Sequence, residues 1–195
     1  MLEKLKGWVG FWNVRCIYFK IIWDTFIWLT IFTIFENKPN ILSFQVPDNR
    51  ISKLDGALNI YTNLQVLDLS NNSLKHLGHY QFTESGKLQL LNLSNNYVSN
   101  LHAQTFEGPK ALQTLDLSKN ILTTLVNASF TALETLVELR LSHNKISSLQ
   151  SAAFTGLVRL RVLYLDHNLM SFINPSWFEH LGSLRFLYLG HNLIR

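Results

Sequence analysis

Three histidines stand at equal intervals along the chain, at His143, His167 and His191, 24 residues apart. If the chain folds as a repeat of that length, these side chains stack on neighbouring coils, about 5 Å apart at the spacing of adjacent strands. Imidazoles at that distance could bind a metal ion or sense acid pH. Solvated loop histidines are the alternative that we favour, so we expect neither a metal nor a cofactor.

Carboxylates offer no better basis for catalysis. Asp68 and Asp116 lie two repeat lengths apart, roughly 10 Å if each coil adds one strand, and no acid–base partner stands between them. The sequence has no glycine-rich phosphate loop, nucleophile elbow or His-Glu-x-x-His motif. A surface built of repeats also lacks the deep, dry pocket that catalysis prefers. We therefore predict that the protein is not an enzyme.

Cysteine content and charge exclude other classes of site. Cys16 is the single cysteine, so the chain can form neither an internal disulfide nor a cysteine-based zinc site, and we expect a small buried hydrophobe there. The formal net charge of +4 is not concentrated in any run. We therefore expect no nucleic-acid ligand.

The composition divides the chain into two regions. Hydrophobic residues make up 47% of the chain and charged residues 15%, but four of the five Trp lie in the first 30 residues. The rest of the chain is rich in Leu, Asn and Ser. We predict an apolar leader over residues 1–36 and a second domain over residues 37–195.

An internal repeat of 24 residues runs through the second region. The segment Leu64–Leu74 aligns with Leu88–Val98, and a degenerate earlier copy spans Ile41–Ile51. The frame returns without insertion at four further leucines: Leu112, Leu136, Leu160 and Leu184. The pattern L-x-x-L-x-L-x-x-N-x-L-x-x-L-x-x-x-x-F over about seven repeats, the last one truncated, predicts a solenoid in which each coil packs on the next.

Each coil should begin with a short strand and return along the other side. The L-x-L segment alternates as a strand with one buried face does, so Leu67 and Leu69 should point inward, and Asp68 and Ser70 outward. A phenylalanine should close each coil, and these rings should stack as a spine on the convex side: Phe82, Phe106, Phe130, Phe154 and Phe178.

An asparagine after each strand forms a second repeated column: Asn72, Asn96, Asn120, Asn144, Asn168 and Asn192. A chain that turns inside a packed stack leaves backbone N–H and C=O groups away from water, and a buried amide can satisfy both kinds of group. We interpret this column as a structural ladder and not as a ligand site.

The repeats resemble those of leucine-rich-repeat proteins, in particular the 24-residue typical class of animal extracellular and receptor proteins. The resemblance covers residues 41–195 and implies an α/β solenoid, a right-handed horseshoe with a concave parallel β-sheet and an irregular or short-helical convex side. A His-Asn pair before the turn is a common variant in that family. The disulfide-bonded caps usual in such ectodomains are missing, and Arg195 falls within a repeat, so we expect part of a longer protein.

In that family the outward positions of the strands bind the ligand. The central column of these positions reads Gln45, Asp68, Asn92, Asp116, Arg140, Tyr164 and Tyr188. Its C-terminal end gathers aromatics beside an arginine, a composition typical of protein-binding hot spots. We therefore predict a protein ligand at Arg140, Tyr164, Tyr188, Phe186 and Asp116. The alternative is that the terminal aromatics cover a further coil.

The leader has features of a targeting segment. Four basic residues precede the uncharged, mostly apolar residues 25–35, which is typical of a signal peptide, although no small-x-small cleavage site follows. An uncleaved signal-anchor helix from about Cys16 to Phe35 is the second interpretation, with the N-terminus held in the cytosol by its positive flank. A leader foreign to the domain is the third. The first two place the repeats beyond a membrane.

Three acceptor sequons, at Asn71, Asn92 and Asn127, agree with that compartment, and Asn127 on the return path is the best placed to carry a glycan. We therefore expect an extracellular or cell-surface recognition module of a receptor or cell-adhesion protein. A cytosolic scaffold of the same fold is the alternative, and the missing cysteine caps favour it.

Overall fold

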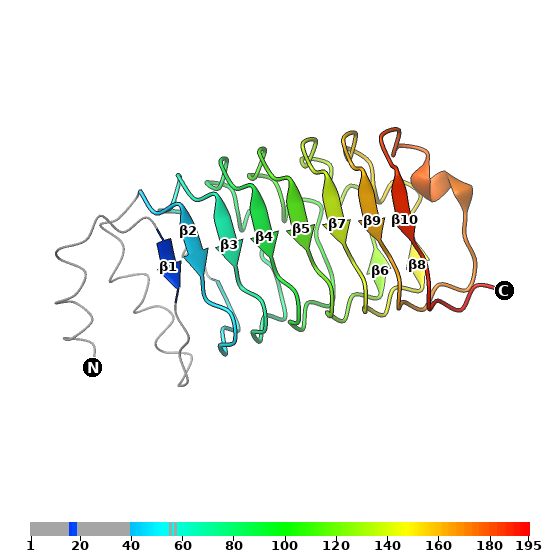
Figure 1. The fold of residues 1–195 in the computed structure, drawn as a ribbon, viewed down its shortest axis with the longest axis horizontal. Helices are drawn as coiled ribbons and strands as arrows, with labels where there is room; N and C mark the ends of the chain where they lie inside the picture. The colour runs from blue at the N-terminus through cyan, green and yellow to red at the C-terminus, as the bar shows by residue number, and fades with distance from the viewer. Residues whose placement is uncertain (1–15, 19–39, 55, 57) are drawn as a thin grey trace.

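The computed structural model describes residues 16–18, 40–54, 56 and 58–195. Over these residues the chain winds into a solenoid whose strands lie side by side along one face (Figure 1). The main sheet has eight parallel strands: β1 (Cys16–Tyr18), β2 (Ser43–Gln45), β3 (Val66–Asp68), β4 (Leu90–Asn92), β5 (Thr114–Asp116), β7 (Glu138–Arg140), β9 (Val162–Tyr164) and β10 (Phe186–Tyr188). The predicted solenoid with a parallel sheet is confirmed.

Neighbouring strands pair in register with the repeat. Leu67 lies opposite Leu91, and Leu91 lies opposite Leu115. Because every coil from β3 onward has the same length, each residue of a strand stacks on its equivalents in the coils before and after it. Equivalent positions of the repeat therefore form columns along the solenoid.

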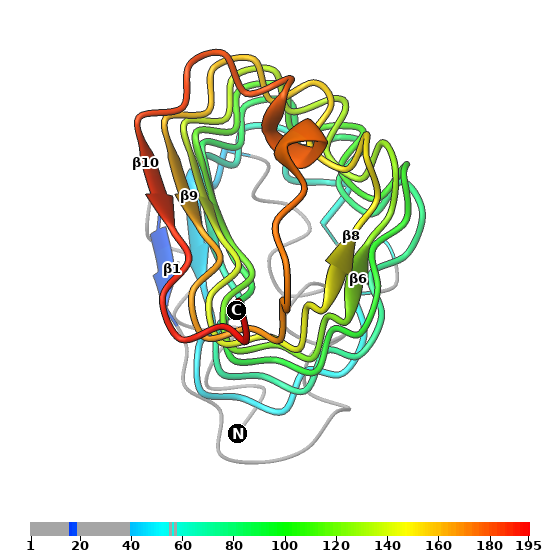
Figure 2. The same ribbon diagram turned by 90° about the vertical axis from the view of Figure 1, so that its right-hand side faces the viewer.

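The convex side carries little regular structure, as expected. β6 (Thr124–Leu125) and β8 (Ser148–Leu149) pair in a two-stranded sheet that lies across the solenoid from the main sheet (Figure 2). The 3₁₀ helix η1 (Pro175–Phe178) follows Asn174, whose side chain accepts a hydrogen bond from the backbone N–H of Ser176. Proline fits in the first turn because its missing N–H would have no partner there.

Leucines of the repeat form a continuous core between the two sides. Leu67 and Leu69 are fully buried, as predicted. Ser70 is predicted to point outward, but the structure leaves only 7% of it exposed. The chain turns at Ser70, and its carbonyl accepts hydrogen bonds from Asn72 Nδ2 and from the backbone N–H of Asp48, which hold it against the stack.

The predicted phenylalanine spine is confirmed. Successive ring centroids are 5.9, 6.0, 6.3 and 6.2 Å apart, and the largest angle between neighbouring ring planes is 17°. The rings belong to Phe82, Phe106, Phe130, Phe154 and Phe178. Such aromatic pairs contribute about 0.5–1.5 kcal/mol each beyond the burial of their area.

Two glycines permit close approach of neighbouring coils. A Cβ at Gly108 would lie 1.8 Å from the carbonyl oxygen of Phe82, and one at Gly156 would lie 2.3 Å from that of Thr131. Gly156 also has a φ of +93°, a conformation that residues with a side chain rarely adopt. Backbone contacts, in addition to leucine burial, therefore set the spacing of the coils.

The asparagine ladder joins each coil to the one before it. Asn120 Nδ2 donates to the carbonyl of Leu93 at 2.9 Å, and Oδ1 accepts from the N–H of Val98 at 2.9 Å; both partners belong to the preceding coil. The same Nδ2 donates to the carbonyl of Leu117 in its own coil. Equivalent bonds are made by the other members: Asn72, Asn96, Asn144, Asn168 and Asn192. The amides satisfy backbone groups that the turn removes from water.

Most of the leader lies outside the described residues, including the segment 25–35. Cys16–Tyr18 is described and forms β1, which pairs with β2. This conformation differs from the helix that the signal-anchor interpretation places from Cys16 onward, because the edge of β2 offers backbone groups that a strand can satisfy. The structure does not describe the side chain of Cys16, so its expected burial stays a prediction. In the part of the chain that is described, no helix has the length and hydropathy to cross a bilayer.

Candidate binding face

The outward side chains of the main sheet form two columns. The central column contains Gln45, Asp68, Asn92, Asp116, Arg140, Tyr164 and Tyr188. The first column, two residues earlier on each strand, contains Ser43, Val66, Leu90, Thr114, Glu138, Val162 and Phe186. Strand pairing places successive members of each column opposite one another. Together the two columns make the concave face.

In the N-terminal half of this face, side chains of the central column accept hydrogen bonds from the backbone. Asp68, Asn92 and Asp116 each accept, through Oδ1, a hydrogen bond from the backbone N–H two residues later. The three distances are 2.9, 3.0 and 2.8 Å. Each side chain thus stabilises the turn that leaves its own strand. These three side chains are half-buried, and the Oδ1 atom of each is engaged in its own turn.

In the C-terminal half, side chains of the central column contact one another. Arg140 Nε donates to Glu138 Oε1 at 2.6 Å, and Arg140 Nη1 lies 3.8 Å from Asp116 Oδ2. The guanidinium carbon lies 5.7 Å from the ring centroid of Tyr164, within the range of a cation–π interaction. The hydrogen bond to Glu138 is the main cause of a raised pKa of Arg140, so its positive charge is fixed.

Two tyrosines continue this series. The rings of Tyr164 and Tyr188 stack with centroids 4.6 Å apart and planes 6° from parallel. Tyr164 is half-buried between Arg140 and Tyr188, and desolvation is the main cause of the raised pKa of its hydroxyl. Tyr188 is 45% exposed. Arg140, Tyr164 and Tyr188 therefore form one run of contacts across three strands.

Phe186 completes the aromatic end of the face. It is 55% exposed and pairs in register with Val162. Residues i and i+2 of a strand share a face, so Phe186 lies beside Tyr188 on β10. The structure thus places all five predicted ligand residues on one face, where four of them are joined through contacts and Phe186 flanks them.

Sequence reasoning missed two arginines at the entry to this region. Arg161 and Arg185 are exposed and stand directly before β9 and β10. Earlier coils have Gln65, Gln89, Gln113 and then Val137 at the same repeat position. A third column, read one residue before the first column, would have revealed the two guanidinium groups at its C-terminal end.

The residue before each ladder asparagine, and before Asn49 in the degenerate first copy, has a left-handed backbone. The φ values lie between 52° and 57° for Asp48, Asn71, Asn95, Lys119, His143, His167 and His191. Asn, Asp and His are enriched in this conformation among residues with a side chain. Backbone geometry therefore accounts for much of the residue choice in this column.

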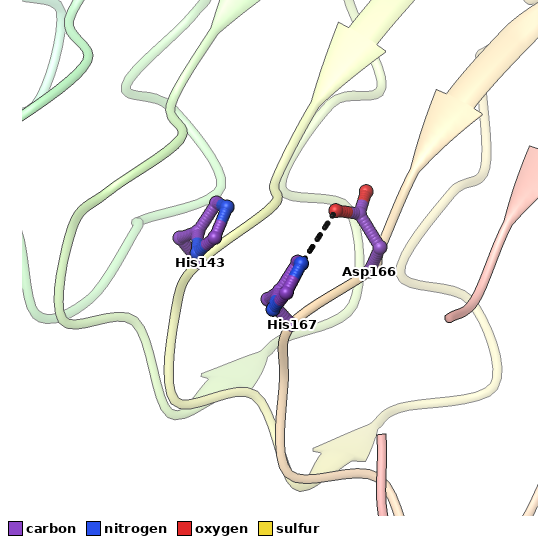
Figure 3. A group of neighbouring side chains, drawn as sticks. All are labelled: His143, Asp166 and His167. Carbon is purple, nitrogen blue, oxygen red and sulfur yellow. Dashed lines mark ion pairs between the residues drawn. The ribbon is translucent and has the colours of Figure 1, made fainter. Parts of the chain in front are cut away.

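The three histidines of this column stack, as their spacing predicts. The ring centroids of His143 and His167 are 4.1 Å apart, as are those of His167 and His191. Asp166 approaches the stack from the neighbouring position, and its Oδ2 lies 3.9 Å from His167 Nε2 (Figure 3). Desolvation, followed by the charges of His143 and His191, lowers the pKa of His167.

Comparison with known families identifies the repeats. The family model for the leucine-rich repeat matches residues 39–98, 86–146 and 134–194. The chain belongs to the leucine-rich-repeat family. Domains of this family are generally binding modules without catalytic activity.

Solved structures agree with this assignment. The chain is similar to the protein in the crystal structure of a TLR13–ssRNA13 complex, with a TM-score of 0.74 and 24% sequence identity. The match covers 99% of this chain and 30% of that one. No curated protein matches the sequence. At this identity the similarity establishes the fold, and the ligand of this leucine-rich-repeat domain has to be inferred from its own surface.

The sequon asparagines occupy three different environments of the leucine-rich-repeat domain. Asn71 belongs to the left-handed column and accepts a hydrogen bond from Asn95 Nδ2. Asn92 lies in β4, within the concave face. Asn127 is exposed on the return path, and its Oδ1 accepts from the backbone N–H of Ala152 at 3.0 Å. Of the three, Asn127 is the one on the side away from the main sheet.

The convex side has an open depression between coils. Its charged and polar lining comes from Thr83, Gln104, Glu107, Lys110, Thr131, Glu134 and Thr135. None of its lining residues is a histidine or a cysteine, so it offers no nucleophile–histidine pair. The concave face is therefore the better candidate for the functional surface.

Proposed function

We propose that this leucine-rich-repeat domain binds a protein ligand through the C-terminal half of its concave face, as the recognition part of an extracellular receptor or cell-adhesion protein. The run of contacts from Arg140 over Tyr164 to Tyr188, with Phe186 exposed beside it, carries the proposal. Tyr and Arg dominate protein hot spots because they combine a large contact area with polar groups.

The geometry favours tight contact because the cluster is already ordered. Glu138 holds the guanidinium of Arg140, and stacking holds both tyrosine rings in parallel planes. Immobilising a flexible side chain on binding costs about 0.5–1.5 kcal/mol, and this cost is reduced where neighbours restrict the side chain beforehand.

A single-stranded nucleic acid is the second candidate ligand. Bases stack on aromatic side chains, which the parallel tyrosines would allow, and the similar TLR13 structure is a complex with ssRNA13. The charges of the face favour a protein. Arg140 is bonded to Glu138 and lies near Asp116, so a phosphate would compete with two carboxylates for it.

The extracellular location is supported by the apolar leader and by the exposure of Asn127. The alternative is an intracellular scaffold that uses the same face. The two differ in whether the solenoid enters the secretory lumen, where sequons are glycosylated.

The binding test exchanges outward residues between strands. Phe186→Thr/Tyr188→Asp gives β10 the outward residues of β5, and Leu90→Thr/Asn92→Asp makes the same exchange on β4 as the matched control. Biotinylated full-length chain is applied to a panel of animal cell lines. We expect staining that trypsin treatment of the cells removes, that ribonuclease leaves intact, and that the β10 variant lowers roughly 30-fold, the effect of losing a 2 kcal/mol hot spot.

Two outcomes would contradict the proposal. Equal staining by the wild type and the β10 variant would remove the aromatic cluster from binding. Sensitivity to ribonuclease, together with binding of a labelled single-stranded RNA that the β10 variant loses, would favour the nucleic-acid candidate. Thermal unfolding of both variants confirms that each remains folded.

The location is tested by a glycosidase shift on a C-terminally tagged chain expressed in animal cells, with medium and membranes assayed separately. A mobility shift that Asn127→Gln reduces places the repeats in the secretory lumen. An unshifted chain in the cytosolic fraction would instead favour the intracellular scaffold.

A further inference from the structure

A cluster of three potential metal ligands lies beside the concave face. The ring nitrogens of His143 and His167 and a carboxylate oxygen of Asp166 lie within 4.8 Å of one another. Figure 3 shows the Asp166 carboxylate directed at the His167 ring, with His143 on the other side of that ring. The sequence interpretation considered the histidines alone, and the structure adds an acidic partner that it did not consider.

Asp166 is held in place by a second interaction. Ser142 Oγ donates a hydrogen bond of 2.6 Å to Asp166 Oδ1, while the other carboxylate oxygen, Oδ2, faces His167. Metal-binding carboxylates usually have an outer partner of this kind, which orients the free oxygen toward the ion. His143 on one coil and Asp166 and His167 on the next therefore form a ligand set whose carboxylate is oriented by Ser142.

We propose that His143, His167 and Asp166 form a binding site for a divalent transition-metal ion of the Zn²⁺ class. Two imidazoles and one carboxylate are a ligand set typical of zinc sites with a fourth, open position. Ligand bonds of about 2.0–2.2 Å require donor atoms about 3.3 Å apart in a tetrahedral site. The donor atoms now lie within 4.8 Å of one another, and the two rings are stacked, so the exposed side chains must turn toward the ion to reach that separation.

The site is open to an ion from solvent. His143 and His167 are both exposed. The open coordination position would face solvent at the margin of the concave face. The site does not depend on the protein ligand proposed above.

The chain itself supplies the conservative substitutions for a test. Earlier coils have Asn at the histidine position, with the same left-handed backbone, in Asn71 and Asn95. They have Ser at the position of Asp166, as in Ser118. His143→Asn, His167→Asn and Asp166→Ser therefore remove ligands while keeping residues that this fold already accepts.

A second ring pair provides the matched control. His79 and His102 stack with centroids 4.3 Å apart, and His79 Nδ1 lies 3.2 Å from Gln104 Oε1. Within the described residues, this pair belongs to no group of three metal-ligating side chains. His102→Asn should therefore leave metal binding unchanged.

The experiment titrates ZnCl₂ into untagged, chelator-treated full-length chain by calorimetry, with MgCl₂ as a probe of non-specific charge. We expect one Zn²⁺ per chain. His143→Asn and His167→Asn should each weaken binding at least 100-fold, Asp166→Ser at least tenfold, and Ser142→Ala about tenfold. His191→Asn should change the affinity less than threefold.

Three outcomes would overturn the proposal. The first is no saturable Zn²⁺ binding to the wild type. The second is equal loss in His102→Asn and His167→Asn, which would indicate scattered surface histidines. The third is unchanged binding in Asp166→Ser with loss in His191→Asn, which would replace the proposed ligand set by the histidine stack alone. Circular dichroism of each variant separates loss of a ligand from loss of the fold.

Discussion

The two halves of the concave face have the same backbone and use it differently. In the N-terminal half, Asp68 and Asn92 bond to N–H groups of their own turns. In the C-terminal half, the same column carries Arg140, Tyr164 and Tyr188, which contact one another across strands. Asp116 belongs to both halves, because one oxygen stabilises its turn and the other faces Arg140.

The left-handed column changes at the same place. Asn95 donates to Asn71 across one coil step, whereas His143, His167 and His191 stack their rings. Both kinds of residue suit the backbone conformation, so the change is not needed for folding. At these outward positions the fold accepts several residue types, so a change of residue type there points to function and not to folding.

The largest effect should come from the ladder that the two halves share. Asn120→Leu should lower the free energy of unfolding by about 1–3 kcal/mol, because it leaves buried backbone groups without partners. Asn96→Leu and Asn144→Leu, one on each side, should cost similar amounts, as measured by chemical denaturation. A melting midpoint unchanged from the wild type would contradict the structural role of the ladder.

The turn-stabilising role of the N-terminal half gives the next effect. Asp68→Ala should destabilise the protein by about 1 kcal/mol, the typical contribution of one hydrogen bond. Asp68→Asn should be nearly neutral, because Asn92 makes the same bond one coil later. Equal losses in the two variants, measured by thermal unfolding, would show that charge and not the hydrogen bond matters.

The contact between Arg140 and Tyr164 should be worth less. A double-mutant cycle with Arg140→Ala and Tyr164→Ala should give a coupling of about 0.5–1 kcal/mol, the range of an exposed cation–π pair. Chemical denaturation of the four proteins measures it. Additive single effects would mean that the two side chains are neighbours without interacting, and would weaken the contrast between the halves.

The smallest effect concerns acid stability of the histidine stack. Because the pKa of His167 is lowered from its ordinary value of 6.5, the unfolded chain takes up the proton more readily than the folded one as pH falls below that value. Stability should therefore decrease between about pH 7 and pH 5, and less so in His167→Asn. Melting curves in the presence of a chelator measure this, with His102→Asn as control. Identical pH dependence in both variants would contradict it.

Much of the solenoid could be predicted from the sequence. The 24-residue period identified the coils, the inward leucines and the stacked phenylalanines, because each of these is set by a spacing that the fold repeats. It also identified the five candidate ligand residues as members of one face. The exposure of Ser70 was predicted wrongly, because alternation ends where the strand ends and the chain turns.

The sequence by itself determined which residues share a column, since a constant period places every equivalent residue one strand spacing apart. Only the tertiary structure decided what each outward residue does there. Whether a carboxylate oxygen bonds to its own turn, as in Asp68, or faces a side chain of the next coil, as Asp116 Oδ2 faces Arg140, depends on side-chain rotamers chosen among contacts from adjacent coils. Those contacts are separated by a full repeat along the chain, so local sequence carries no record of them.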